Sequence, residues 1–558
     1  MSSTTTPRNV AIPYSSKTLK LSSFSIPSNE SAKAASQRFV AAHPTYLQTS
    51  AIDDLRRREF TRLDKSGVYL DYTGAGLYPE SLIREHTDLL LGNVFGNPHS
   101  ASPSSVLSSK YAHAARLAVL NFFDADPSEY EVVFTNNAST ALRIVAEAYP
   151  YSKGAESKLI LPTDAHNSVN GMREFALKAG AQVTYVPMEA PGKQTFLAPE
   201  DGAESLYVLT GQSNLSGLKG NLSLLAEAKS RGYNTLLDAA ALAPTTAISL
   251  RSLKGSVDAM AISLYKLIGY PTGIGCLVAK KEFLTKLQKP WFSGGSVLVV
   301  QAPNMGRLLL DGHERWEDGT VNFLSLIAVP RGLQILHNNL PTLAQRLPLL
   351  MHFTLSSLAS LKHSNGKPVV DLHSPSGPDE YSPSTHGAVI SMSFLKPSGE
   401  RFLPHDIENS ASRAKIHVRA GCLCNPGAST TLTGMTEMLN KFDMKRIDAE
   451  GNQDTPASVT ESYASNEEME WFIRDGGVVR MGFGLASAIS DAAAFVEFSR
   501  TFVDVTEATK DGKTVGAPKL KKIVDAEIIR DELPELKKRN SVMFTKLRGI
   551  RRRVSQIF

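Results

Sequence analysis

Two residues at the ends of apolar segments have types that suit covalent and proton-transfer chemistry. Lys266 closely follows the apolar run "AMAIS" and precedes a turn rich in glycine and proline, and Asp238 ends the run "NTLL". A lysine held partly away from water has a lowered pKa and can act as a nucleophile. A carboxylate at the end of a buried strand must be paired, capped or catalytic. The two side chains therefore indicate a candidate reactive centre.

Further polar residues follow other apolar runs. Ser139 lies where a helix is expected to begin, His166 lies in a loop, and Asn214 lies in "GQSNLSG". Small and hydroxyl residues at a helix N-terminus suit a phosphate, because free backbone N–H groups point at it. Each feature alone has an ordinary structural explanation, such as a helix cap. Together, a lysine, an acid, a phosphate-type helix start and a histidine that could stack on a ring are the parts of a pyridoxal phosphate site.

The chain has only three cysteines, and two of them are one residue apart. Cys422 and Cys424 lie in "VRAGCLCNPGA" (418–428), whereas Cys276 lies in an apolar run. So few cysteines fit a reducing compartment, where a thiol is free to react. Basic residues near the pair favour the thiolate form. A Gly/Pro-flanked loop is expected to be mobile, which lets a thiol visit a buried substrate and then face outwards.

Short apolar runs alternate with helical stretches from about residue 65. This pattern predicts a largely parallel sheet covered by helices on both faces. Ligands of such a sheet bind beyond the carboxyl ends of its strands, where the polar residues above are found. The expected strands are 131–135, 158–162, 181–187, 205–210, 234–240, 258–264 and 273–280.

A long helical segment at 323–340 marks an expected domain boundary. The runs 387–395, 415–421 and 477–484 after it predict a second, smaller α+β unit. The expected organisation has four parts. They are a poorly ordered leader (1–60), a large cofactor-binding domain (61–330), a small domain (331–505) with a polar insertion (440–475), and a basic tail (506–558).

The composition is that of an ordinary soluble globular protein. Of 558 residues, 42% are hydrophobic and 21% are charged, and the net charge of +5 is concentrated in the C-terminal tail. No apolar run reaches the length of a membrane span. We expect no membrane, nucleic-acid or metal partner, and a cytoplasmic location. Because residues 1–29 contain no acid and a few bases, a mitochondrial leader is the alternative.

Ten motifs between residues 65 and 500 resemble, in order, those of fold type I pyridoxal phosphate enzymes. They include "YLDYTGAGLYP", "HNSVNGMRE", "QSNLSG", "LLDAAALAPT", "SLYKLIGYPTGIGCLV", "HVRAGCLCNPGA" and "VVRMGFG". The resemblance is to the class V aminotransferase group, which includes the cysteine desulfurases. Within it the chain is most similar to the desulfurase domain of molybdenum cofactor sulfurases. Ordinary desulfurases usually have His and Gln where this chain has Tyr265 and Ala241. The implied fold is a mostly parallel seven-stranded sheet domain with a smaller α+β domain.

The resemblance implies a role for each matching residue. Lys266 is expected to form the Schiff base and accept the substrate α-proton, and Arg419 to bind the substrate carboxylate. Cys424 is the expected persulfide-forming nucleophile, with Cys422 as the alternative. The remaining expected cofactor contacts are Asp238 at the pyridine nitrogen, His166 on the ring, Asn214 near the ring hydroxyl, and Ser139, Ser263 and the partner subunit's Thr320 at the phosphate.

The expected activity is transfer of sulfur from L-cysteine to an enzyme persulfide, with release of alanine, in a homodimer. The sulfur acceptor is the molybdenum cofactor or a partner protein that carries it. Sulfurases of this group usually continue into a cofactor-binding domain, which the basic residues after 505 do not resemble. A stand-alone desulfurase or C–S lyase for a secondary-metabolite pathway therefore stays open. A non-catalytic scaffold is a third class, against which the intact candidate residues argue.

Overall fold

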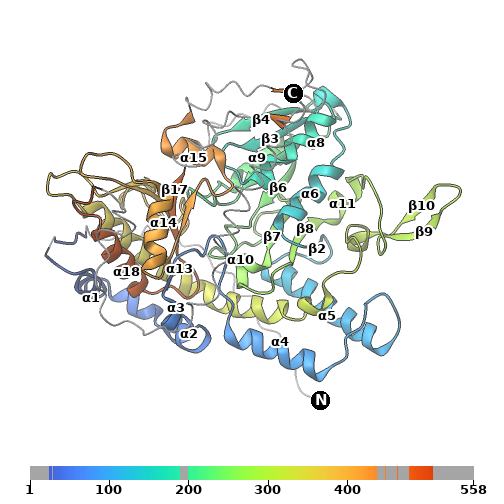
Figure 1. The fold of residues 1–558 in the computed structure, drawn as a ribbon. Helices are drawn as coiled ribbons and strands as arrows, with labels where there is room; N and C mark the ends of the chain where they lie inside the picture. The colour runs from blue at the N-terminus through green and yellow to red at the C-terminus, as the bar shows by residue number, and fades with distance from the viewer. Residues whose placement is uncertain are drawn as a thin grey trace, which may run out of the picture.

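A seven-stranded sheet forms the centre of the large domain in the computed structural model (Figure 1). The structure describes residues 24–27, 29–188, 199–200, 202–436, 446–447, 461–462 and 477–506. The sheet has the order β2-β8-β7-β6-β5-β3-β4, and only β8 runs antiparallel to its neighbours. All seven expected strands of this domain are confirmed. They are β2 (Tyr130–Thr135), β3 (Lys158–Pro162), β4 (Gln182–Val186), β5 (Leu206–Thr210), β6 (Asn234–Asp238), β7 (Ala259–Ser263) and β8 (Gly275–Lys280).

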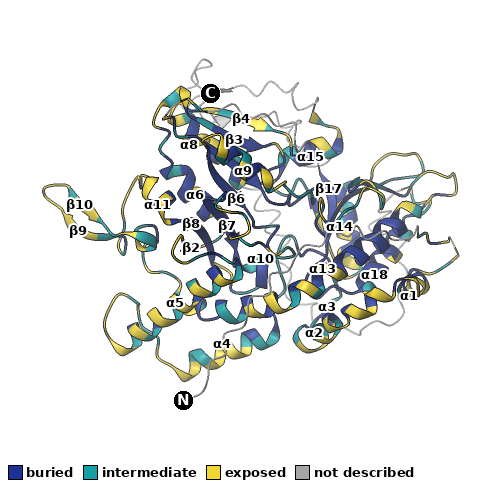
Figure 2. Ribbon diagram, turned by 180° about the vertical axis from the view of Figure 1, so that it is seen from behind, coloured by how far each residue is buried: buried dark blue, intermediate teal, exposed yellow. Residues whose placement is uncertain are grey.

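Helices cover both faces of this sheet, as the alternation of strands and helices predicts. Leu236 and Leu237 are adjacent in β6 and belong to two different core clusters, because successive side chains of a strand point to opposite faces. One face packs against α6 (Ala138–Ala148) and α8 (Met172–Lys178). The other packs against α5 (Pro103–Phe122), α9 (Ser223–Ser230) and α13 (Val329–Ser360). Figure 2 shows the buried sheet between its partly exposed helices.

The small domain is built on a four-stranded antiparallel sheet of order β11-β12-β17-β14. Its strands are β11 (Val370–Ser374), β12 (Val389–Phe394), β14 (Arg419–Gly421) and β17 (Val478–Gly482), and its helices are α14 (Pro404–Arg413), α15 (Pro426–Thr433) and α18 (Ile489–Arg500). The expected strand at 415–421 is split, because β13 (Ile416–His417) pairs instead with β1 (Val68–Tyr69). Strand β11 was not expected. The helix expected at 323–340 is the longer α13, which contacts both domains.

The N-terminal segment from residue 29 onwards is folded, so the expectation of a poorly ordered leader over 1–60 is wrong for 29–60. Helices α1 (Ala32–Ala42) and α2 (Ala51–Glu59) flank the 3-10 helix η1 (Pro44–Thr49). The side chains of Phe39 and Ile52 are fully buried in the core. Arg346 of α13 is also fully buried, and it donates to the backbone oxygen of Thr49 (2.9 Å) and pairs with Asp53. These contacts tie the segment to the domain junction.

The other described elements are short or peripheral. A hairpin of β9 (Val297–Gln301) and β10 (Gly306–Leu309) projects from the large domain (Figure 1). The remaining elements are α3 (Leu63–Ser66), α4 (Glu80–Gly92), η2 (Gly154–Glu156), α7 (Asn167–Asn170), α10 (Leu264–Ile268), α11 (Lys281–Lys286), η3 (Gly312–Arg315), α12 (Phe323–Leu326), β15 (Arg446–Ile447) and β16 (Glu461–Ser462).

Two predicted segments lie almost entirely outside the described residues: the polar insertion at 440–475, apart from β15 and β16, and the basic tail at 506–558. Residues 1–23 of the predicted leader also lie outside them. Among the helices that the structure describes, none is both long and apolar enough to cross a membrane.

Candidate active site

The carboxyl ends of five strands bring most of the predicted site residues to one edge of the large sheet. Strands β3, β5, β6 and β7 are parallel, and Thr210, Asp238 and Ala261 are in register near their ends. Strand β2 runs the same way, because it and β7 both pair antiparallel with β8. A cavity opens at this edge, and six predicted residues line it: Ser139, His166, Asn214, Asp238, Ser263 and Lys266.

Lys266 is the central cation of this cavity. It lies three residues beyond β7, in the short helix α10. Among the described residues, no hydrogen-bond or ion-pair partner lies within reach of its ammonium group. Burial lowers the pKa of Lys266, the positive charges of Arg480 and Arg419 lower it further, and Asp238 partly opposes the shift. The neutral amine is the form in which a lysine attacks a carbonyl, and a lowered pKa increases the fraction of Lys266 in that form.

Asp238, the last residue of β6, and His166, which follows β3, both line the cavity. Asp238 is buried, and its Oδ1 accepts a hydrogen bond from the Ala240 N–H (3.0 Å). His166 caps α7, since its Nδ1 accepts from the Ser168 N–H (3.1 Å). Burial, and then the nearby charge of Lys266, lowers the pKa of His166, with Asp238 opposing. A ring with Nδ1 as acceptor and a lowered pKa is neutral with its proton on Nε2.

The start of α6 provides hydroxyl and backbone groups at one end of the cavity. The Ala138 N–H donates to Ser263 Oγ (2.8 Å), and Ser139 Oγ lies 2.6 Å from Ser168 Oγ. Gly275 allows β8 to approach this helix start, because a Cβ there would lie 2.5 Å from the Asn137 backbone. A helix N-terminus ringed by hydroxyls is suited to an anion.

Arg419 forms a charged bridge at the domain boundary that sequence reasoning missed. It lies directly opposite Arg480 on the neighbouring strand. Both guanidiniums bond to Asp71, at 2.7 Å from Arg419 and 2.6 Å from Arg480. Arg480 is buried, whereas the side chain of Arg419 is 49% exposed. One carboxylate thus serves two cations, which leaves excess positive charge facing solvent through Arg419. Arg419 does not line the cavity itself.

Cys424 lies on a tight turn that three hydrogen bonds hold in this structure, and the mobility expected of this loop stays a prediction. The Asn425 N–H donates to Cys422 O (3.0 Å), Asn214 Nδ2 to Leu423 O (2.8 Å), and the Asn167 N–H to Cys424 O (2.7 Å). Leu423 and Cys424 have φ of 52° and 59°, a conformation that costs non-glycine residues about 1–3 kcal/mol each. The Cys424 thiol is exposed and that of Cys422 is half-buried.

Thr320 is the one predicted cofactor residue that the structure does not bring to the cavity. It follows the β9–β10 hairpin, is exposed, and its Oγ1 accepts a hydrogen bond from Asn97 Nδ2 (3.2 Å). The role of Thr320 toward a second subunit, which the resemblance implies, stays a prediction.

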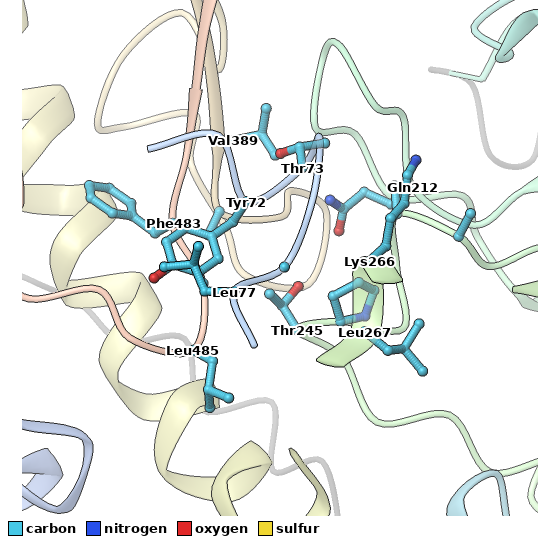
Figure 3. A pocket seen from close by; sticks show the side chains of 16 residues that line it. Tyr72, Thr73, Leu77, Gln212, Thr245, Lys266, Leu267, Val389, Phe483 and Leu485 are labelled. Atoms are coloured by element: carbon cyan, nitrogen blue, oxygen red, sulfur yellow. The ribbon is translucent and has the colours of Figure 1, made fainter. Parts of the chain in front are cut away.

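A second cavity lies on the small-domain side of Lys266 (Figure 3). Tyr72 and Phe483 form one wall, and Gln212 and Lys266 form the other. Gln212 also lines the first cavity, and its buried Oε1 has no hydrogen-bond partner in the described part of the chain. The buried Thr210 Oγ1 is likewise without a partner and faces the first cavity. Orphaned polar atoms of this kind are typical of a ligand site.

Comparison with known proteins identifies the family. The family model described as aminotransferase class-V matches residues 68–440, which contain every predicted site residue. This chain belongs to the class-V aminotransferase family. The matched range covers the whole central sheet and the Cys424 turn of this family member.

Two curated relatives within the family have the same name. The chain is 34% identical to bovine molybdenum cofactor sulfurase over 475 residues, which cover 80% of this chain and 51% of that protein. It is 30% identical to the molybdenum cofactor sulfurase of Arabidopsis thaliana, over 83% of this chain and 60% of that protein. The chain therefore spans between half and two thirds of the length of these relatives.

Solved structures share the fold. A cysteine desulfurase from Thermococcus onnurineus superposes with a TM-score of 0.62 at 22% identity, over 81% of this chain and 98% of that one. One from Escherichia coli gives 0.58 at 20% identity, over 80% and 97%. The fold is that of type I pyridoxal phosphate enzymes, as expected.

The cavity fits the cofactor that this family uses. A lysine without a partner suits a Schiff base, a strand-end carboxylate suits a pyridinium, and hydroxyls at a helix start suit a phosphate. By contrast, the described residues contain no group of three or more His, Cys, Asp or Glu placed to hold a metal ion.

Proposed function

We propose that this chain is a pyridoxal phosphate-dependent cysteine desulfurase that passes sulfur from L-cysteine, through Cys424, to the molybdenum cofactor. The observation that carries the proposal is the meeting of two features. One is Lys266 without a partner in a cavity with Asp238 and a hydroxyl-rich helix start. The other is an exposed cysteine on a turn bonded to Asn214, which lines that cavity, and to Asn167, which lies between the lining residues His166 and Ser168.

The cavity residues would hold the cofactor as follows. Lys266 would bond to its carbonyl carbon, Asp238 would pair with the pyridine nitrogen, and Asn214 and the neutral His166 would contact the ring. Ser139 and Ser263 would bind the phosphate at the start of α6. Pyridoxal phosphate, when bound, supplies an electron sink for the carbon atoms of an amino acid substrate.

The residues of this chain divide the remaining work. Arg419 binds the α-carboxylate of cysteine, because Asp71 leaves part of its guanidinium free for a bidentate contact. Lys266, with its lowered pKa, accepts and returns a proton. The Cys424 thiolate attacks the substrate sulfur. A new S–S bond forms as the substrate C–S bond breaks, and the three-carbon fragment takes up a proton and leaves as alanine.

The acceptor is proposed from the relatives named molybdenum cofactor sulfurase, whose length this chain covers only in part. The exposure of Cys424 supports an acceptor that approaches from outside, either the molybdenum cofactor or a protein that carries it. The scarcity of cysteine supports a reducing location such as the cytoplasm.

We also propose that the chain works as a homodimer in which Thr320 of the partner subunit completes the phosphate site. Two observations support this. Thr320 lies outside the cavity of its own chain and is exposed. The nearby β9–β10 hairpin exposes Leu298, Val299 and Leu308 by 51–62%, and Figure 2 shows it projecting. An exposed apolar ribbon of this kind is typical of an interface.

The first experiment adds L-cysteine to the purified chain and measures its visible spectrum, alanine and protein-bound sulfane sulfur. We expect bound cofactor, alanine and a persulfide in the wild type. Cys424→Ala should retain the cofactor and lose both products, Cys422→Ala should retain both, and Lys266→Ala should lose the lysine-bound spectrum. Pyruvate and free sulfide that do not depend on Cys424 would instead indicate a C–S lyase. A chain that cannot bind the cofactor would contradict the proposed enzymatic function altogether.

A further inference from the structure

Asn425 directly follows Cys424 and is fully buried. Its Nδ2 donates to Asp164 Oδ1 (2.6 Å) and to Asn214 Oδ1 (3.0 Å). Its Oδ1 accepts from the Ala428 N–H (3.1 Å) and so caps α15. Both ends of this amide are therefore used, and the side chain can take only one orientation. The residue after the thiol is fixed by its side chain as well as by its backbone.

Asp164 anchors this amide to the large domain. Its carboxylate is buried and accepts from Ser213 Oγ (2.5 Å) and Ser216 Oγ (2.6 Å), in addition to Asn425. Both of its oxygens are thus bonded, and the three donors come from the loop after β5 and from the Cys424 turn. Close packing accompanies the bonds, because a Cβ on Gly427 would lie 2.0 Å from Thr163 O. The turn is seated on the loop that leads to His166.

Asn214 connects the anchor to the turn itself. Its Oδ1 accepts from Asn425, its Nδ2 donates to Leu423 O (2.8 Å), and its backbone oxygen accepts from Arg480 Nη1 (2.7 Å). The same side chain lines the cofactor cavity. A displacement of the turn would therefore disturb a cofactor contact, and the reverse also holds.

We propose that Asp164, Asn425 and Asn214 form a clamp, here called the turn clamp, that fixes Cys424 beside the cofactor cavity. The acceptor then comes to the thiol, and the loop does not carry the sulfur outwards. Asp164 and Asn425 are positioning residues. This inference rests on the proposed function for its kinetic consequences, but the fixed position of the thiol can be measured without turnover.

Asn425→Ser separates the clamp from the helix cap, because serine caps α15 about as well as asparagine but has no amide donor. Asp164→Asn is the second variant, which keeps the shape and removes the charged acceptor. Thr431→Ala is the matched control, since it removes a side-chain hydrogen bond of the same helix, to Gly427 O, and does not touch the clamp. All variants carry Cys422→Ser. Cys424 is then the only accessible thiol, because Cys276 is buried.

Three quantities are measured: the alkylation rate of Cys424 by iodoacetamide, backbone hydrogen exchange over 422–428, and the bound-cofactor spectrum. We expect alkylation and exchange to be faster in both clamp variants than in the control. Where the wild type forms alanine, kcat should fall about 10- to 100-fold with the cofactor content retained, because misplaced reacting groups cost rates of this order. Rescue of kcat by Asn425→Gln is not expected, since the longer amide cannot satisfy the same partners.

Two results would overturn the clamp. Alkylation and exchange equal to those of Thr431→Ala in both clamp variants would show that the turn does not depend on it. Faster persulfide turnover with dithiothreitol as acceptor in Asn425→Ser would show that the loop must move to deliver sulfur. A wild type that forms no alanine would remove the proposed function but not the clamp, which alkylation and exchange test independently.

Discussion

At the scale of single residues, Lys266 shows how a reactive group is kept at the expense of stability. An amine that is buried without a partner loses hydration and gains no bond in return. We therefore expect Lys266→Met to stabilise the cofactor-free protein by about 1–3 kcal/mol at pH 7. Urea unfolding of the two cofactor-free proteins measures this difference. Lys286→Met is the control, because that side chain is 45% exposed and its change should matter by less than about 0.5 kcal/mol.

The same comparison has a defined pH dependence. The pKa of Lys266 is lower in the folded protein than in the unfolded chain. Between those two values the unfolded chain binds more protons, so the stability of the wild type rises with pH. The advantage of methionine should therefore shrink between pH 7 and about pH 10, where the unfolded lysine also loses its proton. If Lys266→Met were more stable than the wild type by the same amount at pH 7 and at about pH 10, the result would contradict a lowered pKa of Lys266.

Asp71 pairs with both Arg480 and Arg419, the residue proposed to bind the substrate carboxylate. Arg419 and Arg480 lie opposite each other on neighbouring strands, and like charges in this arrangement repel unless an anion lies between them. We expect Asp71→Asn to raise the KM for cysteine about tenfold, because Arg419 loses its orientation. The unfolding free energy should fall by about 3–5 kcal/mol, because Arg480 is left buried without its partner.

Steady-state kinetics and urea unfolding separate these two effects. Asp371→Asn is a matched control in the same domain, where an exposed aspartate lies 3.8 Å from Arg401. It should change neither quantity appreciably, since exposed pairs contribute little. An unchanged KM in Asp71→Asn would remove Arg419 from the substrate site. This bridge could not be predicted from sequence, because Asp71 and Arg480 are 409 positions apart.

At the scale of elements, helices and strands could be predicted from the sequence where the local pattern of apolar residues was clear. The seven strands of the large sheet were predicted because each is a short run rich in apolar residues, and all but the edge strand β4 are largely buried. The site residues at their ends followed from the topology of a parallel sheet. The N-terminal helices were missed, because α1 is rich in alanine and buries a single large apolar side chain, Phe39. The clamp on the Cys424 turn was missed because its partners come from three distant loops.

The N-terminal helices offer a test of that correction. Phe39 lies 5.1 Å from Phe24 and 5.3 Å from Phe353 of α13, measured between ring centroids, and is fully buried. Phe39→Ala should lower the unfolding free energy by about 3–5 kcal/mol, because it leaves a cavity in the core. Leu47→Ala, at a side chain that is 62% exposed, should have almost no effect. Equal unfolding free energies of the two variants in urea would show that the N-terminal segment does not pack stably on the core.

At the scale of the whole molecule, the groups proposed for the reaction come from different parts of the structure. The proposed cofactor cavity lies within the large domain, Arg419 and the Cys424 turn come from the small domain, and Thr320 is exposed and does not line the cavity. The α13 helix packs against the cores of both domains, which holds the two parts of the site together. In the proposed homodimer, formation of the dimer would also complete the phosphate site.

Mixed dimers test whether Thr320 acts across the subunit interface. In the proposed homodimer, Thr320→Ala should weaken cofactor binding about tenfold, because a hydrogen bond to a charged phosphate is lost. Lys266→Ala should prevent covalent attachment. When differently tagged chains that carry one change each are co-expressed, the mixed dimer contains one site with both residues, provided that Thr320 acts across the interface. Borohydride reduction and mass spectrometry should then find tightly bound cofactor on the Thr320→Ala chain, one per dimer. If Thr320 acts within its own chain, no tight site forms in the mixed dimer. A monomer in sedimentation would exclude the shared site altogether.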